Sequence, residues 1–92
     1  MKRAEAEKNT QRVKEIFSRL ADDFPNEPEY RRRLADSLII LGLVVRDRGD
    51  WAAAAEHYRA ALGLQTQLVA ERPESADYRN RQADSRWALA YK

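Results

Sequence analysis

The sequence predicts an all-α fold in which four antiparallel helices form stacked helical hairpins. Four segments of about twenty residues carry apolar residues at helical spacing. Short breaks that contain proline or glycine separate them, and no segment alternates apolar and polar residues like a half-buried strand. We expect a single domain over residues 1–92, with helices at residues 3–23, 27–47, 51–71 and 75–91.

The first two predicted helices have the clearest apolar faces. Residues 3–23 carry one stripe, and polar residues occupy the other sides. The second helix follows Asn26, which we expect to be its N-cap, and has Pro28 and Glu29 in its first turn. The first stripe consists of Val13, Ile16, Phe17, Leu20 and Phe24; the second helix is apolar at Tyr30, Leu34, Leu38, Ile39, Leu41, Leu43, Val44 and Val45. Because the second helix is apolar on more than one side, we expect it to contact several neighbours.

The third and fourth predicted helices follow the N-cap candidates Asp50 and Ser75. The third is rich in alanine, which permits close approach of helices, and Trp51 at its start is expected to lie in the core. The fourth has a thinner apolar stripe, formed by Ala76, Ala83, Trp87 and Ala90.

Residues 24–42 and 72–90 are related by a shift of 48 residues. The same shift places Leu20 on Leu68 and Ala6 on Ala54, so the first helix corresponds to the third. Two kinds of helix therefore alternate, as in an array of stacked hairpins. Eight of the nineteen aligned positions are identical: Pro25/Pro73, Tyr30/Tyr78, Arg31/Arg79, Arg33/Arg81, Ala35/Ala83, Asp36/Asp84, Ser37/Ser85 and Leu41/Leu89.

The middle of the chain carries a recognisable motif. It consists of Leu38-x2-Leu41-Gly42-x2-Val45, then Gly49-Asp50-Trp51, then Ala54-x3-Tyr58 and Ala61. This motif resembles a tetratricopeptide repeat (TPR), with a period of 48 residues in place of the family's ~34. The resemblance implies a short right-handed TPR-like solenoid that presents a concave surface to peptides or partner proteins.

The same resemblance implies which residues face that surface. They are Asp36, Ile39, Leu43 and Arg46 on the second helix and Asp84, Trp87 and Tyr91 on the fourth. Trp87 and Tyr91 are the expected anchors, because tryptophan and tyrosine are enriched in binding hot spots. Packing of Ile39 and Leu43 against Trp87 between the two helices, which would leave little groove, is an equal alternative.

The two flanks of the array are more polar than its centre. Gln82 and Arg86 stand where the second helix has Leu34 and Leu38, and we expect them to face water. At the other flank, Glu7, Thr10 and Lys14 replace Ala55, Tyr58 and Leu62 and are expected to face water as well. Sequence drift, or contact of Gln82 and Arg86 with a partner chain, is the alternative explanation.

Composition and motifs argue against several classes of protein. The net charge is only +2, there is no cysteine, and the longest apolar run is too short to span a membrane. We expect a soluble cytoplasmic protein. The single histidine, His57, has no nucleophile motif beside it, and no metal-ligand spacing or phosphate-binding loop is present. We therefore expect no catalytic residue, no metal and no cofactor.

Six arginines, near Tyr30, Tyr78 and Trp87, raise the question of nucleic-acid binding. They are Arg31, Arg32, Arg33, Arg79, Arg81 and Arg86. Acidic residues lie within about one turn of them, so a solvated face of ion pairs is the favoured interpretation.

The leading hypothesis is a non-catalytic scaffold module that binds a protein or peptide. The first alternative is a structural building block whose apolar faces drive self-association, for example as a homodimer. The second is a weak binder of nucleic acid or an anionic ligand through the arginines.

Overall fold

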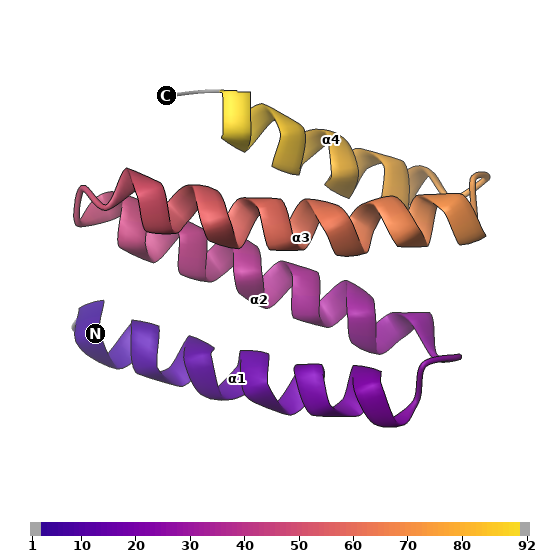
Figure 1. The fold of residues 1–92 in the computed structure, drawn as a ribbon, viewed down its shortest axis with the longest axis horizontal. Helices are drawn as coiled ribbons and strands as arrows, with labels where there is room; N and C mark the ends of the chain where they lie inside the picture. The colour runs from indigo at the N-terminus through magenta and orange to yellow at the C-terminus, as the bar shows by residue number, and fades with distance from the viewer. Residues whose placement is uncertain (1–2, 91–92) are drawn as a thin grey trace.

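The computed structural model describes residues 3–90 and contains four α-helices (Figure 1). They are α1 (Arg3–Asp23), α2 (Pro28–Asp47), α3 (Trp51–Glu71) and α4 (Ala76–Ala90). No strand occurs between residues 3 and 90, so the predicted all-α class is confirmed. The observed bounds at the three turns lie within one residue of the predicted bounds, and residue 91, the predicted end of the fourth helix, lies outside the described residues. Within the described residues, no helix combines the length and hydropathy that a membrane span requires.

Local chemistry accounts for the helix boundaries. The Asp50 side chain accepts a hydrogen bond from the Ala53 amide at 3.1 Å, and the Ser75 hydroxyl accepts one from the Tyr78 amide at 3.2 Å. Gly49 adopts φ 86°, a left-handed conformation that suits glycine, in the turn between α2 and α3. The expectation for Asn26 is wrong: Glu27 occupies the N-cap of α2 without a side-chain cap, and Pro28 opens the helix.

The helices lie side by side in chain order, so that each one contacts the next (Figure 1). The molecule is a slab with extents of 36 × 29 × 19 Å. Its hydrophobic core belongs mainly to α2 and α3, where the buried apolar residues are Ala35, Leu38, Leu41, Val45, Ala54, Tyr58, Ala61 and Leu68. As its two apolar faces predict, α2 packs against both α1 and α3.

The fourth helix is attached in a way that its apolar stripe does not predict. Ala76, Ala83, Trp87 and Ala90 are all exposed. The fully buried residue of α4 is instead Ser85, which donates a hydrogen bond to the buried Gln65 side chain of α3 at 2.5 Å. The half-buried Ala88 and Leu89 pack against Val45, Ala54 and Tyr58. The prediction failed because α4 is attached through the Ser85–Gln65 pair and through Ala88 and Leu89, which lie outside the predicted stripe.

Two further expectations about burial are wrong. Trp51 is exposed, because it opens α3 at the edge of the helix pair. In α1, the polar residues Glu7, Thr10 and Lys14 are half-buried, since this face of the helix lies against α2. The apolar side chains of Val13 and Ile16 are exposed in their place. At the α4 flank, by contrast, Arg86 is exposed as expected, and Gln82 is half-buried and donates to Thr66.

Residues related by the 48-residue shift share local contacts. Ser37 and Ser85 are both buried. Glu29 pairs with Arg33 at 2.9 Å, and the corresponding Asp77 pairs with Arg81 at 3.1 Å, each one helical turn apart. These three pairs of positions therefore have similar surroundings on α2 and α4, whereas Ala35 is buried and the equated Ala83 is exposed.

Candidate functional site

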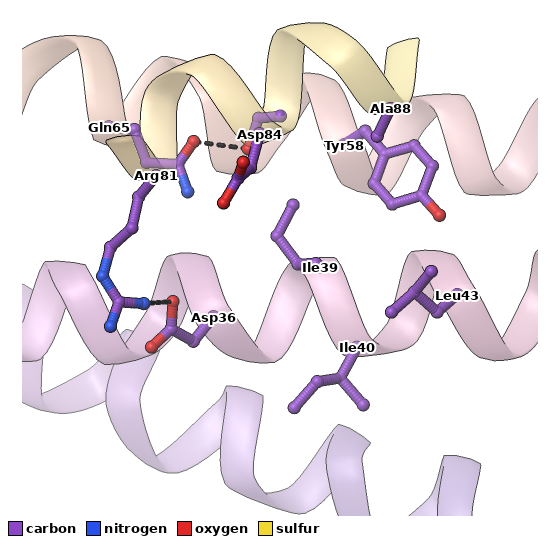
Figure 2. Close-up of a pocket in the computed structure, with 10 residues that line it drawn as sticks. Asp36, Ile39, Ile40, Leu43, Tyr58, Gln65, Arg81, Asp84 and Ala88 are labelled. Atoms are coloured by element: carbon purple, nitrogen blue, oxygen red, sulfur yellow. Dashed lines mark hydrogen bonds and ion pairs between the residues drawn. The ribbon is translucent and has the colours of Figure 1, made fainter. Parts of the chain in front are cut away.

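The candidate site is an open groove of about 450 Å³ between α2 and α4, with α3 as its floor (Figure 2). All three helices contribute to its lining. The lining residues are Asp36, Ile39, Ile40 and Leu43 from α2, Tyr58 and Gln65 from α3, and Arg81, Asp84, Ser85 and Ala88 from α4.

The α2 wall of the groove is a single helix face. Asp36, Ile39, Ile40 and Leu43 are spaced i, i+3, i+4 and i+7, which places them on adjacent turns. Ile40 is 48% exposed and Leu43 is 40% exposed, so a wide part of this wall is apolar and open to solvent. Such a surface favours contact with apolar groups of a ligand.

The floor of the groove is buried and partly polar. The Ser85–Gln65 hydrogen bond closes the floor between α3 and α4 (Figure 2). Tyr58 is buried, and among the described residues its hydroxyl has no hydrogen-bond partner. Burial raises the pKa of Tyr58; the charge of Arg46 opposes this rise, and the charge of Asp47 adds to it. Tyr58 is therefore a neutral phenol at the base of the groove, with a hydroxyl that is itself buried.

One end of the groove is charged. Arg81 forms an ion pair with Asp36 across the groove, which ties α4 to α2 (Figure 2), and a second with Asp77 on its own helix. Asp36 also accepts from Arg32 at 3.2 Å. Asp84, in contrast, is exposed and takes part in no ion pair with any residue between 3 and 90. This end therefore offers an uncompensated carboxylate.

The groove brings together four of the seven residues that the sequence places on the binding face. Asp36, Ile39, Leu43 and Asp84 line it. Arg46 is half-buried on α2 near Tyr58 but does not line the groove. Trp87 lies one turn beyond Asp84, is 71% exposed and does not line the groove, and Tyr91 lies outside the described residues.

Sequence reasoning missed six lining residues, which are Ile40, Tyr58, Gln65, Arg81, Ser85 and Ala88. Ile40 and Ala88 occupy equivalent positions under the 48-residue shift, so the repeat itself contained a signal for both. Arg81 corresponds to Arg33 and pairs with the acid one turn earlier, as Arg33 does. Its second contact, with Asp36, depends on how α4 lies over α2 and has no local signal in the sequence.

The other candidate sites do not gather into a pocket of reactive groups. The arginines are largely engaged: Arg31 with Glu71, Arg32 with Glu29 and Asp36, Arg33 with Glu29, and Arg79 with the Pro73 carbonyl. His57 is half-buried on α3 and does not line the groove. Within residues 3–90, no three histidine, aspartate or glutamate side chains are grouped as ligands for a metal ion.

Comparisons of the chain with known protein families, with curated proteins and with solved structures give no match.

Proposed function

We propose that this protein is a non-catalytic interaction module that holds a segment of a partner protein in the groove between α2 and α4. One observation carries the proposal: the groove combines the half-exposed apolar side chains of Ile40 and Leu43 with the uncompensated carboxylate of Asp84. An apolar surface with a few placed polar groups is typical of recognition sites.

The proposal specifies the chemistry of the segment. Apolar side chains would cover Ile40 and Leu43, and a lysine or arginine beside them would pair with Asp84. A segment with an acidic group in place of the basic one would meet two aspartates and a single arginine that is already paired.

Two features from the sequence belong to the same proposal. The resemblance to TPR proteins is part of it, because the groove lies between the two helices that the resemblance assigns to partner binding. A soluble, cytoplasmic setting without cofactor or catalysis is also part of it, supported by a chain that is 35% charged and lacks cysteine.

A random peptide display selection against the immobilised chain tests the proposal. We expect enriched peptides to carry apolar residues next to lysine or arginine. Binding of a selected peptide is then measured by calorimetry on wild type and on variants. Leu43→Glu places a charge on the apolar wall of the groove and should weaken peptide binding by about tenfold or more. Asp84→Asn should weaken the binding of those peptides that contain the basic residue.

Val13→Glu is the matched control. Val13 is 41% exposed, nearly the same as Leu43, but it lies on α1, away from the groove. Its substitution should leave peptide binding within about twofold of wild type. The proposal would be overturned if selected peptides bound the Leu43→Glu variant with the same affinity as wild type. It would also be overturned if the selection showed no preference for basic residues.

A further inference from the structure

The outer face of α1 is apolar, and no described element covers it. Val13 is 41% exposed and Ile16 is 57% exposed. Ile16 and the half-buried Leu20 line a shallow groove together with charged residues that include Glu15 and Asp23. Exposed apolar side chains that adjoin one another on a helix favour burial against a partner.

The internal repeat indicates what kind of helix would cover this face. Under the 48-residue shift, Val13, Ile16 and Leu20 correspond to Ala61, Leu64 and Leu68 of α3. Ala61 is packed in a cluster with Ala35 and Leu38 of α2, and Leu64 packs against that cluster. The face that α1 leaves open is thus the face that α3 uses to pack on α2. A helix equivalent to α2 would fit it.

Within the chain, the helix equivalent to α2 is α4, and its corresponding surface is also open. Ala83 and Arg86 occupy the positions of Ala35 and Leu38, and both are exposed. The packing of α2 on α3 can therefore be repeated between α4 of one copy and α1 of another.

Charges on the two open faces are complementary under the same shift. Arg31 of α2 donates to Glu71 of α3 at 2.7 Å, and these positions correspond to Arg79 and Asp23. Neither Arg79 nor Asp23 takes part in an ion pair with any residue between 3 and 90. The repeated packing would bring them together between two copies.

A second pair of charges follows from the direction of the helices. Arg31 pairs with Glu71, whereas Val45, further along α2, packs against Ala54, so α2 and α3 are antiparallel. In the same register, Arg86 of one copy comes opposite the turn of α1 that holds Glu15. This carboxylate and the guanidinium of Arg86 are both without an ion pair among residues 3–90.

We propose that this protein associates with further copies of itself head to tail, with α4 of one copy packed on α1 of the next. The contact joins two different surfaces, so each copy keeps one open α1 face and one open α4 face. Such an association grows with concentration and does not stop at a dimer. The contact is small and polar at its rim, and weak binding is expected.

Sedimentation velocity tests this proposal with the 92-residue chain. Between about 10 μM and about 1 mM, we expect the average mass to rise above 10.7 kDa and to pass the mass of a dimer. Ile16→Glu blocks the α1 face and Ala83→Glu blocks the α4 face, and each variant alone should stay monomeric. Both positions are exposed, so circular dichroism of each variant should match wild type.

The mixture of the two variants is the decisive sample. The Ile16→Glu variant keeps an intact α4 face, and the Ala83→Glu variant keeps an intact α1 face. The mixture should therefore form a one-to-one dimer and nothing larger. Leu43→Glu changes the groove and should associate like wild type, which separates this test from that of peptide binding. A wild-type chain that stays monomeric at 1 mM, or an Ala83→Glu variant that associates like wild type, would overturn the proposal; the latter result would indicate a symmetric contact between α1 helices.

Discussion

At the scale of single residues, Gly42 determines how closely α2 and α3 approach. Its Cα faces the Tyr58 ring, and a Cβ built on it would lie 2.8 Å from Tyr58 Cδ1 and closer still to Cε1. That ring belongs to the core and cannot move freely, because Val45 and Ala54 pack with it. A methyl group at this position therefore has to push the two helices apart.

We predict that Gly42→Ala destabilises the protein, although alanine is the better helix former. The overpacking costs about 1–3 kcal/mol, and the gain in helix propensity returns about 1 kcal/mol at most. Gly63→Ala is the matched control, since Gly63 is exposed within α3 and a Cβ there meets nothing within 4 Å. It should stabilise the protein by about 0.5–1 kcal/mol. Urea unfolding measures the change in the free energy of unfolding for each variant. Changes of the same sign in the two variants would contradict the prediction.

At the scale of helices, the sequence predicts boundaries well and predicts faces only in part. Proline, glycine and capping residues act locally, so the helix bounds at the three turns between residues 23 and 76 follow from them to within one residue. The burial of α2 also follows, because its apolar residues are numerous enough to define two faces. Which face of α4 is buried does not follow from its own apolar residues. Ser85 is buried because it bonds to Gln65, which is twenty residues away in the sequence. The candidate groove is likewise predicted at Asp36, Ile39 and Leu43 but not at Ile40 on its α2 side, and only at Asp84 on its α4 side.

The first turn of α2 should make stability depend on pH. Glu29 accepts hydrogen bonds from Arg32 at 2.7 and 2.8 Å and from Arg33 at 2.9 Å. These bonds, Arg32 first, lower its pKa to about 2. Because the folded pKa lies below the unfolded value of 4.5, the stabilisation is present above pH 4.5 and is lost as the pH falls towards 2. The side chain is partly exposed, so we expect it to contribute no more than about 1 kcal/mol.

Glu29→Gln should therefore lower the free energy of unfolding at pH 7 and have little effect near pH 2. Urea titrations at several pH values measure the difference between the variant and wild type. Glu74→Gln is the control, because Glu74 is exposed and has no ion pair within residues 3–90. A Glu29→Gln effect that is equally large at pH 7 and pH 2 would show that the carboxylate charge is not its cause.

At the scale of the whole molecule, stability is concentrated in the α2–α3 pair. Of the residues whose burial the structure describes, 5–90, all of the buried apolar ones belong to this pair, and α1 and α4 flank it. In α4, Ser85 is the one buried residue among 76–90, and the remaining contacts are made by the half-buried Ala88 and Leu89, by the Gln82–Thr66 hydrogen bond and by the ion pairs of Arg81. Since few apolar contacts hold it, α4 has a low free energy of local opening.

Hydrogen exchange should therefore show lower protection in α4 than in α2. We expect the amides of residues 80–88 to exchange at least about tenfold faster than those of residues 35–45 after correction for intrinsic rates. A ligand in the groove contacts α2 and α4 and should raise the protection of α4 but not of α1. Growth of head-to-tail chains should raise the protection of both α1 and α4, because each contributes one side of that contact. Equal protection of α2 and α4 in the dilute monomer would mean that the helices open as one cooperative unit.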